Sequence, residues 1–177
     1  MKKLQLLPVG RVDVRLLDWL RQSLQEKFQI KAEIVGPTLD VAFSLHSERQ
    51  QYHSSEILAA MQAYRQKNTW KLLGVTSLDL YIPILTFVFG EAQLGGDAAV
   101  VSYHRLRQEF YGLPPDLDVQ ANRLLIEAVH ELGHTLHLTH CDDYHCAMAG
   151  SHAVEWIDLK DSGYCESCLA RVMEVAR

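Results

Sequence analysis

The sequence lacks cysteine throughout its first 129 residues, and it has no run of about 18 apolar residues such as a membrane-spanning helix needs. It also lacks any block of basic residues: 17 Lys and Arg stand against 22 Asp and Glu, for a net charge of −5. A groove that follows nucleic-acid phosphates needs the opposite balance. We therefore expect neither nucleic acid nor a membrane as a partner.

The N-terminal stretch lacks the features of a secretory signal. Its apolar residues are interrupted by Gln5 and Pro8, and no small-residue cleavage site follows them. We therefore expect a cytoplasmic protein. In that compartment thiols stay reduced, and clustered cysteines are more often metal ligands than disulfides.

The composition is that of a globular protein. Of the 177 residues, 48% are hydrophobic and 22% are charged, and no repeat or low-complexity tract is present. This length predicts a single domain at 1–177. We expect it to divide into a larger N-terminal subdomain at 1–139 and a C-terminal subdomain at 140–177, and to act as a monomer.

Hydrophobic periodicity predicts strands alternating with helices. An amphipathic helix at 12–28 lies between strand-like segments at 4–7 and 31–35. We further expect a helix capped by Ser54 or Ser55 and reaching 64, a strand at 78–82, apolar runs at 87–91 and 98–102, a long helix capped by Asp118, and a final helix at 166–175. The two apolar runs form either a hairpin through the Gly95-Gly96 turn or neighbours joined by a longer loop. The order indicates α/β or α+β layers.

The long helix carries the motif His130-Glu131-x-x-His134. Residues four apart lie one turn apart on the same helix face, so both imidazoles can reach one Zn²⁺. Glu131 faces a different direction and can accept a proton from water that attacks a carbonyl. The pattern therefore indicates metal-assisted hydrolysis of a peptide or similar bond.

Two further histidines follow the motif, His137 and His140. His140 stands at the interval of the third ligand in the extended zinc-protease motif. If the helix continued past His134, His137 would lie about 10 Å along the axis from His130, too far for both to bind one zinc. We therefore expect His140 to be the third ligand in preference to His137.

All four cysteines follow His140, at Cys141, Cys146, Cys165 and Cys168. Two disulfides are geometrically conceivable, but the x4 and x2 spacings beside a histidine cluster favour four thiolate ligands around one zinc. Such a closed site is structural, because it leaves no position for a substrate. It would connect the segment after His140 to the C-terminal helix and contribute to folding.

Taken together, these motifs resemble the archaemetzincin family of zinc-dependent metalloproteases. The resemblance extends to Gly74-Val75-Thr76, to the run from Pro83 to Ala92 and to Phe110-Tyr111-Gly112-Leu113-Pro114, and so covers about 4–169. It implies an α+β, metzincin-like fold. We expect a twisted, mainly parallel sheet with an antiparallel edge strand, backing helices, a long active-site helix and a zinc-stapled C-terminal subdomain.

The resemblance also implies the role of each site residue. Three histidines would hold the catalytic zinc, Glu131 would be the general base and acid, Met148 would lie in the Met-turn beneath the metal, and the four cysteines would hold a second zinc. One position departs from the family pattern: His137 stands where metzincins carry Gly at a sharp bend. A non-glycine residue there costs roughly 1 to 2 kcal/mol in the left-handed conformation.

The sequence therefore predicts a zinc peptidase with two zinc ions, acting on a peptide or protein substrate. Two alternatives fit the same residues: a silent or weakly active zinc-binding module that recognises peptides, and a zinc hydrolase of a non-peptide amide. The segment from Phe87 to Glu91 resembles the family's edge strand, whose free backbone groups could pair with a substrate. An interior strand fits that segment equally well.

Overall fold

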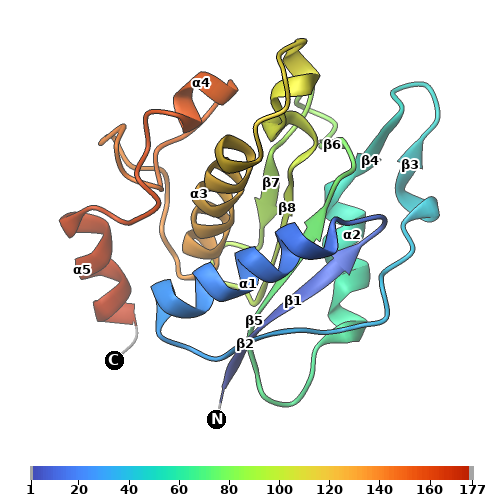
Figure 1. Ribbon diagram of the computed structural model, residues 1–177. Helices are drawn as coiled ribbons and strands as arrows, with labels where there is room; N and C mark the ends of the chain where they lie inside the picture. The colour runs from blue at the N-terminus through green and yellow to red at the C-terminus, as the bar shows by residue number, and fades with distance from the viewer. Residues whose placement is uncertain (1, 176–177) are drawn as a thin grey trace.

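A five-stranded sheet forms the centre of the computed structural model, which describes residues 2–175 (Figure 1). In spatial order its strands are β2 (Ala32–Ile34), β1 (Lys3–Val9), β5 (Thr69–Thr76), β8 (Ala98–Ser102) and β7 (Gly90–Ala92). The first four are parallel, and β7 runs antiparallel to β8. The predicted mainly parallel sheet with an antiparallel edge strand is confirmed.

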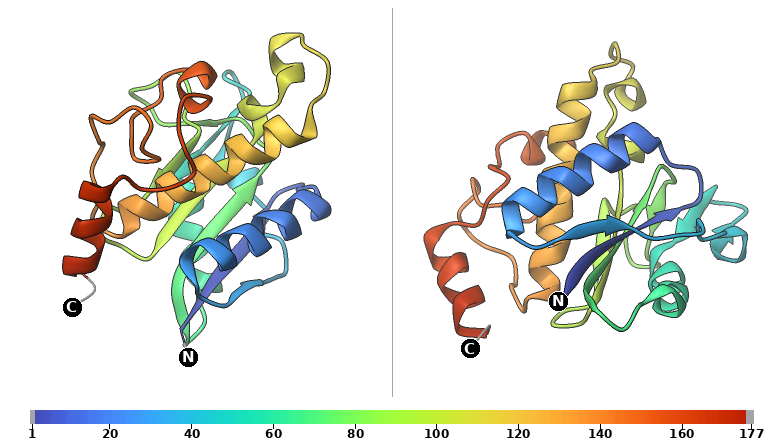
Figure 2. Two further views of the ribbon diagram at one scale, coloured as in Figure 1. Left: turned by 60° about the vertical axis from the view of Figure 1, so that its left-hand side comes forward. Right: turned by 60° about the horizontal axis from the view of Figure 1, so that its bottom comes forward.

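Helices cover both faces of this sheet. One face packs against α1 (Val14–Phe28) and α3 (Leu117–Thr135), and the other packs against α2 (Ser54–Met61) (Figures 1 and 2). Side chains alternate along β1 and β5, so each strand contributes leucines to both apolar cores. The sheet is therefore buried on both faces, as parallel sheets are.

Smaller elements surround this centre. A second sheet has the order β3 (Leu45–His46), β4 (Gln51–His53) and β6 (Leu80–Tyr81). Short 3₁₀ turns lie at η1 (Ala42–Ser44), η2 (Gln62–Tyr64), η3 (His104–Leu106) and η4 (Gln108–Tyr111). Within the described residues, no helix is long and apolar enough to cross a membrane.

The long helix α3 begins two residues earlier than predicted. Its N-cap is Asp116 and not Asp118: the Asp116 carboxylate accepts hydrogen bonds from the backbone N–H groups of Asp118 (3.1 Å) and Val119 (3.0 Å). Asp118 instead lies in the first turn, where its charge suits the helix dipole. The helix ends at Thr135, directly after the second histidine of the motif.

The predicted caps of α2 are also wrong. Ser54 and Ser55 are the first residues of the helix, and the N-cap position is His53, whose side chain makes no capping bond. Both serine hydroxyls instead donate to the carboxylate of Glu91 on β7. These bonds join α2 to the edge strand, a contact between residues far apart in the sequence.

The central strand β5 is missing from the sequence-based prediction. Its residues are almost all buried, because helices cover both faces of the sheet, and so they show no polar–apolar alternation. The expected strand at 78–82 shortens to Leu80–Tyr81 and belongs to the small sheet. The two apolar runs do form a hairpin, but its first strand covers only Gly90–Ala92.

The C-terminal segment carries α4 (Val154–Ile157) and α5 (Glu166–Val175), and it lies beside α3 (Figure 2). It has a small core of its own, built on Leu138, Cys146, Met148 and Cys168. The hydroxyl of Tyr164 donates to the Val129 carbonyl of α3 at 2.9 Å. The division at 139/140 stays a prediction.

Candidate metal centre and active-site cleft

Three histidines converge at the C-terminal end of α3. His130 and His134 lie one turn apart on the helix, and His140 returns to them after the chain has left it. Their ligand atoms all lie within 4.8 Å of one another, and the two Nε2 atoms of His130 and His134 are 3.1 Å apart. The structure thus brings together the three histidines that the sequence selects.

Backbone carbonyls fix the orientation of two of these rings. Nδ1 of His130 lies 2.7 Å from the Ala147 oxygen, and Nδ1 of His134 lies 2.8 Å from the Leu138 oxygen. Because a carbonyl only accepts, each Nδ1 carries the proton and each Nε2 keeps a free lone pair. Burial holds the pKa of His130 well below its ordinary value, and burial also lowers the pKa of His134. Neutral imidazoles with converging Nε2 atoms are the donor set that zinc requires, so these residues fit the metal.

His137 lies outside this group, in the bend that the histidine motif requires. Its φ is 66°, the left-handed conformation expected where metzincins carry Gly. Its imidazole packs onto Gly95 and leaves no room for a side chain at position 95. Gly95 itself has a φ of 67°. The Gly95 N–H also donates to the His134 carbonyl at 2.8 Å. The hairpin turn therefore holds the bend that returns His140 to the site.

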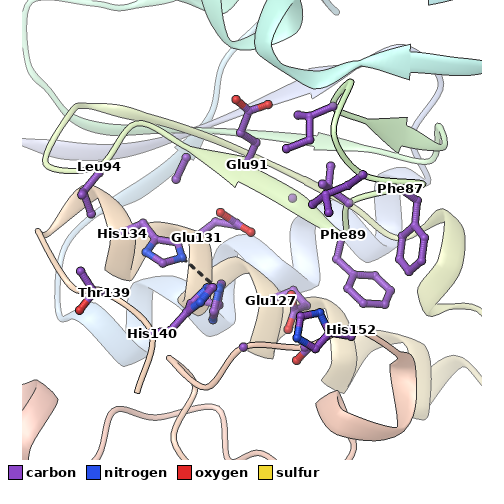
Figure 3. A pocket seen from close by; sticks show the side chains of 18 of the residues that line it. Phe87, Phe89, Glu91, Leu94, Glu127, Glu131, His134, Thr139, His140 and His152 are labelled. Carbon is purple, nitrogen blue, oxygen red and sulfur yellow. Dashed lines mark hydrogen bonds between the residues drawn. The ribbon is translucent and has the colours of Figure 1, made fainter. Parts of the chain in front are cut away.

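Glu131 is buried on α3 with its carboxylate at the cleft (Figure 3). Burial raises its pKa well above the ordinary value, and the charges of Glu127 and Glu91 raise it further. In Figure 3 its side chain lies next to His134 and His140, between these histidines and the strand that carries Glu91. A carboxylate in this environment binds a proton more strongly than an exposed one.

The three histidines and Glu131 lie in a cleft of about 700 Å³ between α3, β7 and the segment after Met148. Leu94 and Thr139 lie at one side of the metal-binding group, and Phe87, Phe89 and His152 lie at the other (Figure 3). Further apolar side chains of the lining come from Ile82, Leu85, Val88 and Ala92. Such a surface suits an extended chain with apolar side chains.

Two arginines hold the loop of Leu85, Thr86 and Phe87, which forms one wall of this cleft. The guanidinium of Arg49 donates to the carbonyls of Leu85 (2.8 Å) and Thr86 (2.9 Å). That of Arg105 stacks 4.2 Å above the Phe87 ring. The wall is therefore fixed by side chains from distant parts of the sequence.

Met148 is fully buried and packs against α3. Its sulfur occupies the space that a side chain at Gly133 would fill. Gly133 directly precedes His134 in the motif. The family resemblance implies that Met148 belongs to the Met-turn. Its role at the metal stays a prediction.

The four cysteines form a second group whose sulfur atoms lie within 4.8 Å of one another. All four are free thiols, and Sγ of Cys141 is 3.7 Å from Sγ of Cys165, far beyond disulfide length. A tetrahedral zinc site with Zn–S bonds of about 2.3 Å places its sulfurs about 3.8 Å apart. The cluster therefore fits a metal ion and does not fit two disulfides. Backbone hydrogen bonding from Cys168 lowers the pKa of Cys165, whereas burial raises the pKa of Cys146 and of Cys168.

Three buried charged residues around the site are not predicted from the sequence. Nζ of Lys71 on β5 donates to the carbonyls of Thr135 (2.9 Å) and Gly96 (2.6 Å), and so caps the C-terminal end of α3. Lys160 and Glu127 pair in the interior close to His130. The partners of Lys71 are backbone carbonyls far away in the sequence, so no local sequence pattern predicts that this lysine is buried.

This combination defines a class: an α+β fold with a mainly parallel sheet, a His-Glu-x-x-His helix and a third histidine at one cleft are the marks of a zinc metallopeptidase. The sequence profile of peptidase family M54 matches residues 16–174. The chain belongs to this family, the archaemetzincins, and is a zinc metallopeptidase.

Known relatives agree with this assignment. The chain is 41% identical to the archaemetzincin of Methanocaldococcus jannaschii, over 94% of this chain and 90% of that protein. It is 38% identical to the archaemetzincin of Pyrococcus furiosus over the same shares. Among solved structures, the archaemetzincin of Archaeoglobus fulgidus complexed with malonate superposes with a TM-score of 0.82 at 34% identity, covering 96% of this chain and 99% of that one.

Proposed function

We propose that this chain hydrolyses peptide bonds at the cleft, with zinc held by His130, His134 and His140 and with Glu131 as general base and acid. The observation that carries the proposal is the convergence of three histidines, two of them oriented by backbone carbonyls, beside one buried carboxylate. Three protein ligands leave a fourth position open, as catalytic zinc sites do. When bound there, zinc would act as a Lewis acid that lowers the pKa of water and polarises a carbonyl.

Glu131 moves the proton in this proposal. Its carboxylate accepts a proton from the attacking water and then donates that proton to the amine that leaves. The raised pKa of Glu131 supports the role, because a carboxylate that binds protons more strongly is the better base. Contact with Gly90 holds the carboxylate at the cleft and limits its motion.

The peptide substrate would lie along β7. This strand ends the sheet order, and its residues line the cleft, so its outer backbone groups are available to pair with an extended chain. Antiparallel or parallel pairing there would carry the scissile bond past Glu131. The apolar wall around Phe87 and Phe89 would bind substrate side chains.

A second, structural zinc would occupy the cluster of Cys141, Cys146, Cys165 and Cys168. It would staple the 140–177 subdomain, because Cys141 and Cys146 precede α4 whereas Cys165 and Cys168 lie at the start of α5. Cys141 directly follows His140, so closing this cluster would also position the third catalytic ligand. The expected content is two zinc ions per chain.

Chelation tests this function directly. A chelator that removes the zinc of the three-histidine site should abolish peptide hydrolysis, and added Zn²⁺ should restore it. A His130→Ala, His134→Ala double variant should bind one zinc ion and should not hydrolyse peptides. Hydrolysis at the wild-type rate by that variant would contradict the proposal.

A further inference from the structure

A buried ion pair lies next to His130 and has no part in the mechanism above. Nζ of Lys160, just after α4, donates to Oε1 of Glu127 on α3 at 3.2 Å. The two side chains are 0% and 4% exposed. Glu127 lies one turn before Glu131 on α3 and lines the same cleft (Figure 3).

The same ammonium reaches the backbone group that orients His130. Nζ of Lys160 lies 3.4 Å from the Ala147 oxygen, and Nδ1 of His130 lies 2.7 Å from that oxygen. One carbonyl therefore accepts from both a lysine and a ring proposed to bind zinc. The Ala147 N–H in turn donates to the Gly163 carbonyl at 2.9 Å, so both backbone polar groups of Ala147 are hydrogen-bonded.

Stability alone is a weak reason for this pair. Removing a lysine and a glutamate from water is unfavourable, and an apolar pair of the same volume is often as stable. An exposed location for either charge would avoid that cost. The placement of the ammonium on the Ala147 carbonyl gives the pair a specific use.

We propose that Lys160 is a positioning residue of the three-histidine site. Its ammonium, anchored by Glu127, holds the Ala147 carbonyl where it accepts the Nδ1 proton of His130, and so directs Nε2 of His130 toward the metal. The inference rests on the proposed function, since it takes His130 as a zinc ligand. Partners of ligand histidines tune metal affinity by about 10- to 100-fold.

The chain offers a matched control. Arg123 on α3 pairs with Asp158 at 2.6 Å, and this pair joins the same two segments as Lys160 and Glu127. Arg123 lies one turn before Glu127, and Asp158 lies two residues before Lys160. Arg123 donates to Asp158 and to the Leu106 carbonyl, and within the described residues this pair makes no hydrogen bond to Ala147. It therefore tests attachment of α4 to α3 without the contact to His130.

Four proteins are compared as purified full chains: wild type, Lys160→Met, the double variant Lys160→Met/Glu127→Leu, and Asp158→Asn. The zinc dissociation constant of the three-histidine site is measured by competition with a chromophoric chelator, and the thermal midpoint is measured in parallel. The double variant leaves no unpaired buried charge, so it folds even if Lys160→Met does not.

We expect zinc binding at the three-histidine site to weaken by about tenfold or more in both Lys160 variants. Asp158→Asn should change it by less than about twofold, because its pair does not contact the Ala147 carbonyl. A double variant that binds zinc as tightly as wild type would overturn the inference, because the pair would then be structural only. An equal loss in Asp158→Asn would also overturn it. If wild type itself binds no zinc at these histidines, the proposed function fails first, and the inference fails with it.

Discussion

Glu131 packs directly against Gly90. A methyl group added at Gly90 would lie 2.7 Å from both Cγ and Oε1 of Glu131, and 2.6 Å from the carbonyl oxygen of Val100. The edge strand β7 and the helix α3 therefore approach so closely that no side chain fits at position 90. The location of the proposed general base is set by the strand opposite it as well as by its own helix.

The first prediction concerns this contact. Gly90→Ala must displace either the Glu131 carboxylate or β7, because the added methyl group would lie too close to Glu131 and to the Val100 carbonyl oxygen. We expect kcat/KM for peptide hydrolysis to fall by about 100-fold, the cost of a small misplacement of a catalytic group. Zinc content should stay at the wild-type value.

Gly163→Ala serves as its control, because a methyl group at Gly163 meets no atom within 4 Å. That variant should keep wild-type kcat/KM and zinc content. Full activity in Gly90→Ala would show that Glu131 need not lie where the structure places it. Loss of zinc in Gly90→Ala would indicate a wider collapse of the site.

The second prediction separates the two histidines that follow the motif. His140→Ala should lose the zinc of the three-histidine site and all peptide hydrolysis. His137→Gly should keep both, and its free energy of unfolding should stay within about 1 kcal/mol of wild type, because relief of left-handed strain offsets the lost packing on Gly95. Metal analysis and a urea titration of each variant provide the test. Zinc loss in His137→Gly would reverse the ligand assignment.

The third prediction concerns the cysteine cluster. Cys168→Ser should lose one zinc ion and about 3 kcal/mol or more of unfolding free energy, which is what a ligand at 100 times its Kd contributes. His145→Ala is the control, because this exposed histidine lies between two of the cysteines in sequence but outside their cluster. Thermal melts and metal analysis would show whether the two variants differ. Equal stability would contradict a structural zinc there.

The fourth prediction tests the cap of the active-site helix. Lys71→Met removes the ammonium that binds the Thr135 and Gly96 carbonyls, and it should cost about 1.5 to 3 kcal/mol in urea unfolding. Lys3→Met breaks a more exposed pair with Glu33 and should cost at most about 1 kcal/mol. Similar costs for the two variants would mean that Lys71 has no special role at α3.

Local spacing explains why much of the site is predictable. His130, Glu131 and His134 lie on one helix, whose geometry alone places them together. The return of His140 follows from the motif interval, although the bend that makes it possible depends on the contact between His137 and Gly95, residues of two different elements. The sequence alone does not predict this contact between His137 and Gly95.

Long-range contacts explain what could not be predicted. The strand β5 has no alternation, because both of its faces are buried. Lys71 reaches a carbonyl 64 residues away, and lysines are exposed in most proteins, so nothing local marks this one as buried. Ser54 looks like a helix cap, yet its hydroxyl is taken by Glu91 from across the fold.

A digest of a peptide library by wild type and by Glu131→Gln, both loaded with zinc, tests whether the chain is a peptidase with Glu131 as general base. The substitution keeps the size of the side chain and removes only its ability to hold and release a proton. We predict that wild type cleaves peptides and that the variant keeps the same zinc content but loses at least about 100-fold in kcat. Equal cleavage by both proteins, or cleavage by neither, would contradict the account.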